Sequence, residues 1–266
     1  MTRRRDLAHL PGSFGFPVIG HTLHFAADAE RWATEAYRDH GRIYKSHFMF
    51  EPVVVFADPD AAKQVLLDRT ETFSSTLGWE PTIGKLFARG LMLRDFDDHR
   101  HHRRIMQAAF RSEVMAGYLD LMRPLIDGAL DGWRGRSRID FYDEVKKITL
   151  DIASTVFVGL PLGGDAGWMN RRFMDAVNAS VAPVRWELPG SAFRRGMEAR
   201  RELERFFGEL VPQRRTGDGD DMLTRLCHAE SEDGDRFGDD EIVDHMIFLL
   251  LAAHDTTTST MATMAW

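Results

Sequence analysis

The residues best suited to chemistry lie near the C-terminal end of the sequence, where an acid and several hydroxyl residues follow a long apolar run. The run extends from Ile242 to Leu251, and the sequence Ala-Ala-His-Asp-Thr-Thr-Thr-Ser follows at 252–259. β-Branched threonines are mediocre helix formers, because they crowd the preceding turn and their hydroxyls compete for backbone carbonyls. A buried helix that contains them is therefore predicted to use the hydroxyls.

Helical spacing predicts that part of this segment forms one face. Phe248, Ala252, Asp255, Thr256 and Ser259 lie at i, i+4, i+7, i+8 and i+11. Small residues there allow a flat ligand to approach the backbone closely. The Thr256 hydroxyl can reach the carbonyl oxygen of Ala252 and loosen the helix, which would leave room for water or a diatomic ligand. The alternative is a core helix whose hydroxyls bond their own backbone and whose acid pairs with a base.

The basic segment 97–110 is a second candidate site. His99 and Arg103 lie four residues apart on one predicted helical face. Arginine grips carboxylates through paired hydrogen bonds and histidine adds a donor, so the pair suits an anionic group on an apolar ligand. Two alternatives stay open, namely a metal site at His99 and His102 and a solvated basic face. Adjacent arginines would repel a metal cation, and no further ligand is evident.

The elements that position these residues are mostly helices. Residues 1–24 are rich in proline and glycine and predict an ordered arm, and residues 43–57 predict a β-hairpin made of runs 43–48 and 53–57. The segment 97–110 and the residues 238–266 predict a basic helix and a long final helix. With further helical segments between them, the sequence indicates a mainly α fold with a small β-sheet.

Composition narrows the class of protein. Of the 266 residues, 44% are hydrophobic and 28% are charged, which is ordinary for a soluble globular protein. The net charge of −7 argues against nucleic-acid binding. No apolar run approaches the roughly 20 residues that span a bilayer, so a soluble, cytoplasmic protein without a transmembrane anchor is expected. The only cysteine, Cys227, excludes an internal disulfide and reads as a structural or surface residue, not a metal ligand.

Taken in order, these segments resemble the N-terminal half of a cytochrome P-450, a haem-thiolate monooxygenase. Residues 252–257 resemble the oxygen-activation motif of that family's central helix, and His99-x-x-x-Arg103 resembles its haem-propionate clamp. Residues 11–21 resemble its proline-rich entry segment. The resemblance covers the chain as a single partial domain, 1–266, and implies the P-450 fold truncated within the long central helix. Ala253 stands where the family usually has glycine, which would narrow the groove.

The resemblance implies a haem-dependent monooxygenase that inserts one oxygen atom from O2 into a lipophilic small molecule. Its cofactor would be haem b, with electrons from NAD(P)H delivered by a ferredoxin or flavoprotein. Thr256 would help deliver a proton to dioxygen, and Asp255 would feed that proton relay. His99, Arg103 and Ala252 would bind the cofactor.

Substrate and donor contacts are also implied by the resemblance. The expected substrate-pocket residues are apolar: Leu86, Phe87, Phe248 and Ala253. They favour a lipophilic substrate such as a terpenoid, fatty acid, retinoid or sterol. Arg100 and Arg104, turned away from the clamp face, could receive an acidic electron donor.

One part of the family pattern has no match in the sequence. In this family the Glu-x-x-Arg helix pair and the Phe-x-x-Gly loop with the thiolate cysteine lie beyond the central helix, where this sequence has no residues, so no metal ligand is assigned. Because the thiolate promotes cleavage of the O–O bond, the chain is expected to be an incomplete polypeptide that is inactive alone. A non-catalytic haem-binding remnant and a helical lipid-binding module are the alternatives.

Overall fold

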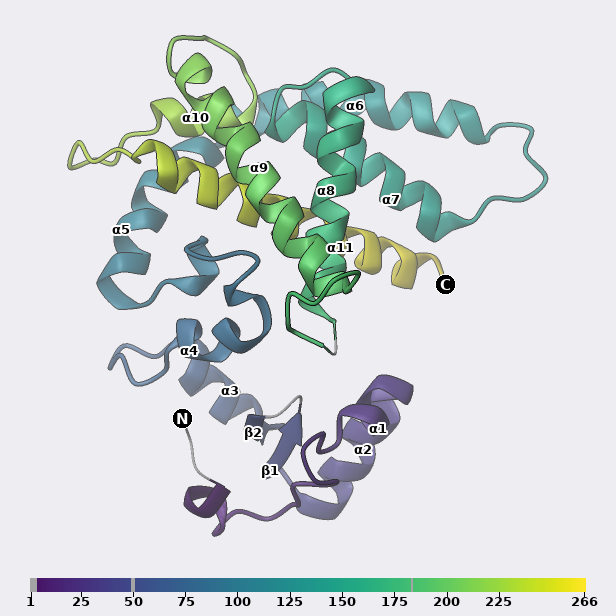
Figure 1. The fold of residues 1–266 in the computed structure, drawn as a ribbon, viewed down its shortest axis with the longest axis vertical. Coiled ribbons are helices and arrows are strands. Elements are labelled where there is room, and N and C mark those ends of the chain that lie inside the picture. Colours follow the sequence, from purple (N-terminus) through teal and green to yellow (C-terminus); the bar gives the residue numbers. More distant parts are fainter. Residues whose placement is uncertain (1–3, 49–50, 183) are drawn as a thin grey trace. The chain divides into compact units, whose positions relative to one another are not determined.

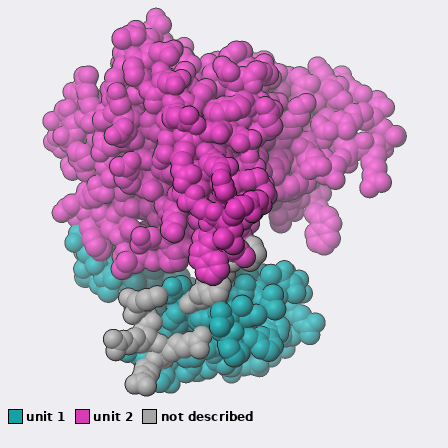
Figure 2. All heavy atoms as spheres, in the orientation of Figure 1, with its two compact units in different colours: residues 1–73 teal, residues 74–266 magenta. Residues whose placement is uncertain are grey.

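The computed structural model describes residues 4–48, 51–182 and 184–266, and it is mainly helical with one two-stranded sheet (Figure 1). The fold class predicted from the sequence is thereby confirmed. The chain divides into two compact units, residues 1–73 and 74–266, which are coloured separately in Figure 2. The expectation that residues 1–266 belong to one partial domain stays a prediction.

The first unit combines short helices with the hairpin. Its elements are α1 (Thr22–Ala27), α2 (Ala29–His40), β1 (Ile43–Phe48), β2 (Glu51–Phe56) and α3 (Pro59–Leu66), after a 3-10 turn at Arg4–Leu7. The strands are antiparallel, with Ile43 opposite Phe56 and Phe48 opposite Glu51. Two boundaries differ from the sequence-based expectation, because α1 begins inside the predicted coil and β2 covers 51–56 instead of 53–57.

Local signals explain where the helices of this unit begin and end. The Asp28 carboxylate accepts a hydrogen bond from the Arg31 backbone N–H at 2.9 Å and caps α2. Gly41, with φ of 82°, ends that helix in a conformation that glycine tolerates. Asp58 caps α3 in the same way as Asp28, and Pro59 occupies the first helical position.

The second unit is a helical bundle. Its elements are α4 (Ser75–Trp79), α5 (Phe96–Met106), α6 (Ser112–Trp133), α7 (Phe141–Ile152), α8 (Gly164–Ser180), α9 (Ala192–Arg215), α10 (Met222–His228) and α11 (Asp239–Ala265), with π-helical turns at Glu80–Gly84 and Ala153–Phe157 and 3-10 turns at Leu91–Leu93 and Gln107–Phe110. The basic helix predicted over 97–110 is therefore α5 followed by a tighter 3-10 turn.

The core of the second unit lies around α11, which contacts α7, α8, α9 and α10. In Figure 1, α11 (yellow) passes behind α9 (green). Residues 242–248 of α11 are all buried, although two of them, Asp244 and His245, are polar. The long apolar run predicted from the sequence is therefore the central core helix of this unit.

None of the described helices is both long enough and apolar enough to cross a lipid bilayer.

Candidate functional site

The second half of α11 carries a change from buried to exposed side chains. The helix begins after Gly238, whose backbone N–H donates a hydrogen bond to the Glu241 carboxylate at 2.8 Å. Three acidic residues in the first turn stabilise the helix further, because the N-terminal end of the helix dipole is positive. From 252 onward most of the described side chains are exposed, Ala252, Thr256 and Ser259 among them, and only His254 and Thr258 are buried. Ala252, Thr256 and Ser259 form an exposed strip of small and hydroxyl side chains that follows the buried segment 242–248.

The Thr256 hydroxyl donates a hydrogen bond to the Ala252 carbonyl oxygen at 2.6 Å, which is the contact expected from the sequence. Thr258, Thr260 and Thr263 make the same bond one turn back, at 2.8–3.0 Å. Such bonding is therefore common to the segment and does not by itself mark a site. The expected loosening is absent, because α11 is α-helical without interruption from 239 to 265.

Exposure separates the threonines. Thr258 is fully buried and its hydroxyl lies 3.0 Å from that of Thr149 on α7, so it joins two helices. Thr256 lies on the exposed strip beside Ala252, where its hydroxyl can meet a ligand. The backbone of Asp255 belongs to the same helix, but its side chain lies outside the described residues. Its catalytic role stays a prediction.

One arginine of the basic helix α5, Arg103, differs from the arginines on and just before this helix in its ion pairing. Arg94 pairs with Asp98 at 3.0 Å, Arg100 pairs with an aspartate at 2.6 Å, and Arg104 pairs with another at 3.1 Å. Within the described part of the chain, the exposed Arg103 side chain has no such carboxylate or other hydrogen-bond partner. A guanidinium left without an anion is suited to an anionic ligand.

His99 lies beside Arg103 on the same face and is half-buried. Its pKa is lowered from the ordinary value, first by burial and then by the positive charge of Arg103. A neutral imidazole with one N–H next to a permanent cation can donate to a carboxylate without adding a second full charge. The geometry therefore keeps the predicted clamp pair together.

The expected substrate-pocket residues lie in the core. Leu86 and Phe87 are completely buried, and the Phe87 ring contacts Phe173 edge-on at 6.4 Å. Phe248 is also buried, and a Cβ on Gly90 would lie 2.4 Å from its Cβ, so only glycine fits beside it. Ala253, also assigned to the pocket, is half-buried. This burial favours a packing role for Leu86 and Phe87, and the assignment of all four as substrate contacts stays a prediction.

Sequence reasoning missed two buried polar networks. Asp244 of α11 accepts from Arg200 of α9 at 3.0 Å and pairs with Arg89 at 2.7 Å, while Arg200 also donates to the Leu86 carbonyl oxygen at 2.7 Å. His245, the next residue, lies 2.8 Å from His102 of α5. The available signal was the presence of two polar residues, Asp244 and His245, inside the apolar run.

The alternative of a metal site at His99 and His102 is not supported. His102 is buried against His245, and the described residues contain no group of three or more potential metal-ligating side chains. Cys227 is buried on α10 with its Sγ 3.8 Å from the Val211 carbonyl oxygen, and burial raises its pKa to about 11. A thiol with this pKa stays protonated, so the structure assigns Cys227 to the core and not to a thiolate site.

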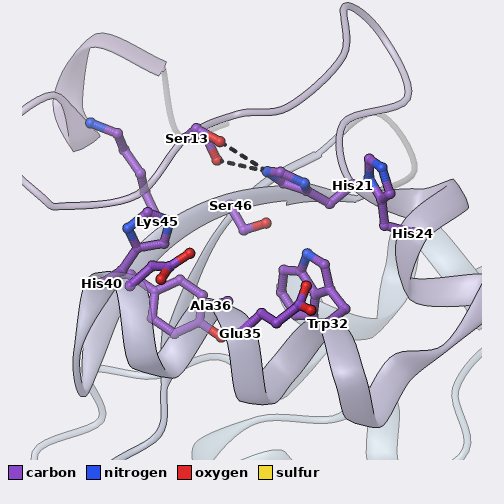
Figure 3. A pocket seen from close by; sticks show the side chains of 11 residues that line it. Ser13, His21, His24, Trp32, Glu35, Ala36, His40, Lys45 and Ser46 are labelled. Atoms are coloured by element: carbon purple, nitrogen blue, oxygen red, sulfur yellow. Dashed lines mark hydrogen bonds between the residues drawn. The ribbon is translucent and has the colours of Figure 1, made fainter.

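The first unit holds a separate pocket of about 230 Å³ between α2, β1 and the N-terminal arm. Figure 3 shows the His21 ring hydrogen-bonded to Ser13, with Trp32 and Glu35 among the other lining residues. Its lining mixes carboxylates, imidazoles and the Lys45 amine, so it selects no single class of ligand.

Comparison with known proteins places these features in one family. A model of the cytochrome P-450 family matches residues 10–264. A Mycobacterium tuberculosis protein that carries the name cytochrome P-450 136 is 40% identical over 260 residues, covering 96% of this chain and 53% of the relative. Abscisic acid 8'-hydroxylase of Solanum lycopersicum is 28% identical over 258 residues, which are 94% of this chain and 53% of the relative.

A solved structure agrees with the sequence comparison. The retinoic-acid-bound cyanobacterial CYP120A1 matches with a TM-score of 0.82 at 24% identity, over 95% of this chain and 58% of that chain. This likeness shows a shared fold. The chain spans about half the length of the curated relatives it matches. The family model and the 40% identity show that the chain belongs to the cytochrome P-450 family.

Proposed function

We propose that the chain is the N-terminal part of a haem-dependent monooxygenase that inserts one oxygen atom from O2 into a lipophilic small molecule. The observation that carries the proposal is the exposed strip of α11, where the exposed Ala252 and Thr256 follow the buried segment 242–248 and the Thr256 hydroxyl bonds the Ala252 carbonyl. A flat cofactor can lie on the small Ala252 side chain while the hydroxyl of Thr256 stands beside it.

The residues present fit a haem b group. Arg103, which lacks a carboxylate partner within the described part of the chain, and its neighbour His99 would bind the propionates, and Ala252 would contact the ring. With a thiolate ligand, haem supplies the reductive activation of dioxygen. Cys227 does not suit that ligand, so the thiolate would come from outside these 266 residues, which alone would be inactive.

Thr256 would hold and move a proton at its hydroxyl. In the structure its single O–H is donated to the Ala252 carbonyl, which leaves the oxygen lone pairs as acceptors toward the exposed side. Donation to dioxygen requires the hydroxyl to rotate away from that carbonyl and to receive a replacement proton. Asp255, the preceding residue in the sequence, is the proposed source of that proton.

The proposed substrates are lipophilic and the proposed electron source is NAD(P)H through a ferredoxin or flavoprotein. Retinoic acid, named with one structural neighbour, and abscisic acid, named for one relative, are the first compounds to test. Arg100 and Arg104 are already paired with Asp97 and Asp233, so an acidic donor would have to compete with these carboxylates. The cytoplasmic location stays a prediction.

The proposal is tested by Thr256→Ala in the full-length protein, with Thr263→Ala as the matched control. Thr263 is exposed on the same helix and donates to the Ser259 carbonyl at 2.9 Å. The substrate used is retinoic acid or abscisic acid, whichever causes the larger shift in the absorption spectrum of the haem. Thr256→Ala should still consume NAD(P)H, but a larger share of the NAD(P)H electrons should end in hydrogen peroxide than in the parent protein. Thr263→Ala should produce no more hydrogen peroxide per NAD(P)H than the parent protein. Equal product per NAD(P)H in both variants contradicts the assignment of Thr256.

A further inference from the structure

A buried pair of histidines joins the clamp helix α5 to the central helix α11. The Nδ1 atom of His102 lies 2.8 Å from the Nε2 atom of His245, and the two residues are 2% and 0% exposed. The Phe237 ring stacks on His102 with centroids 5.3 Å apart and lies 4.7 Å from the His245 ring. The hydrogen bond is therefore shielded from water by an aromatic cover.

The surroundings favour one arrangement of protons in the pair. The Nε2 atom of His102 lies 3.4 Å from carboxylate oxygens of both Asp98 and Glu241, so it carries a proton to donate. Its Nδ1 is then an acceptor, and the Nε2–H of His245 is the donor. This leaves the Nδ1 of His245 as a buried acceptor without a partner among the described residues. The opposite arrangement would bury an unpartnered N–H donor at Nδ1 of His245, which costs more free energy than an unpartnered acceptor.

The pair fixes the rotation of α5 about its own axis. Successive residues of an α-helix are separated by about 100°, so the direction of His102 determines that of Arg103, and His99 lies one turn earlier beside both. With His102 held between His245 and the carboxylates, Arg103 stays exposed and His99 half-buried. The helix also has Ile105 and Met106 in the core, but apolar contacts are non-directional and set rotation less sharply.

We propose that His102 and His245 are positioning residues, which hold α5 at the rotation in which His99 and Arg103 bind the propionates of haem. The inference rests on the proposed function, because it acts through the clamp. In this proposal neither histidine contacts the cofactor. Its consequence is that disturbing the pair should weaken haem retention through Arg103.

Acid should disturb the pair. The charged and titratable groups that face His102 come from two places. Arg94, Asp98 and His101 belong to α5 and the segment before it, and Glu241 and His245 belong to α11. The groups that face His245 are His102 and Arg94. A protonated His102 must donate from Nδ1 as well, which would force His245 to accept at Nε2 and to bury an unpartnered N–H at Nδ1. Burial opposes that protonation and lowers the pKa of His102.

The test is a double-mutant cycle on haem release from the full-length protein to excess apomyoglobin. The variants are Arg103→Ala, His245→Leu and the double variant, and urea unfolding of each apoprotein is measured alongside. Each single change should speed haem release about tenfold, within the coupling range of residues in one network. The double variant should speed haem release by clearly less than the product of the two single effects, because both changes act on the same clamp. Additive effects on release overturn the inference.

Two amide variants keep the test decisive if His245→Leu unfolds. The side-chain nitrogen of His245→Gln can occupy the position of Nε2, whereas that of His245→Asn stops at the position of Nδ1 and cannot reach His102. The glutamine variant should release haem at close to the original rate and the asparagine variant about tenfold faster. Equal rates overturn the inference. If Arg103→Ala itself leaves release unchanged, the clamp assignment fails and this inference fails with it; failure of the cycle alone leaves the clamp standing.

Discussion

Close packing of α8 against α9 gives a prediction with a calculable sign. Gly196 of α9 faces α8 so closely that an added Cβ would lie 2.2 Å from the Ala179 Cβ and 3.0 Å from the Asp175 carbonyl oxygen. Non-bonded carbon atoms normally approach to about 3.5–4.0 Å. The substitution Gly196→Ala therefore requires the two helices to separate locally by about 1.5 Å.

Two opposing effects set the size of the change. Replacing glycine by alanine inside a helix stabilises it by about 1 kcal/mol. Overpacking costs about 1–3 kcal/mol, and the upper value applies here because the two nearest atoms that Gly196→Ala would meet, on Ala179 and Asp175, are fixed to the α8 backbone. The net loss in the free energy of unfolding is about 2 kcal/mol, which corresponds to a Tm lower by about 4–8 °C.

Gly208 provides the matched control on the same helix, because a Cβ there would meet nothing within 4 Å. Gly208→Ala should raise the free energy of unfolding by about 0.5–1 kcal/mol, from helix propensity alone. Urea unfolding followed by far-UV circular dichroism measures both variants against the parent protein. If Gly196→Ala is as stable as Gly208→Ala, the packing of α8 on α9 is not as close as the structure has it.

Three further predictions concern buried polar groups. Asp244→Ala should lower the free energy of unfolding by about 3 kcal/mol in urea titrations, because it leaves the buried Arg200 without its aspartate; a loss under 1 kcal/mol would contradict this. Burial lowers the pKa of His102, and that of His245 to about 3, so the unfolded chain binds more protons and stability should fall as pH drops below about 6.5. The loss, at most about 1.4 kcal/mol per pH unit for each histidine, should be smaller in His245→Leu, and equal pH slopes would argue against it. Cys227 should resist iodoacetamide at neutral pH until urea unfolds the protein, and rapid alkylation of the native state would refute its burial.

The elements predicted well from the sequence are those with local signals. Asp28, the Asp58-Pro59 pair and Gly238 stand directly before or at the observed helix starts, and such signals can be recognised in a sequence because a cap bonds to groups only two or three positions away. The bond from Thr256 to the carbonyl of residue 252 was predictable for the same reason, since helical geometry alone brings the two together.

Features that depend on distant contacts could not be predicted in this way. His102 and His245 are 143 positions apart, so nothing in the local pattern indicates that they meet. Leu86 and Phe87 are predicted from the sequence as pocket residues, and only the packed structure shows that both are completely buried. That Arg103 has no carboxylate partner among the described residues likewise depends on which distant acids the fold brings near it.

Haem binding by the full-length protein tests the central claim most directly. The measurement combines haem stoichiometry with the absorption spectrum of the reduced carbon-monoxide complex, in the parent protein and in Arg103→Ala. The account predicts one haem per chain with the red-shifted Soret band of a thiolate complex, and weaker haem retention in Arg103→Ala. A protein without haem, or one that retains haem equally well after Arg103→Ala, would contradict the account of this site.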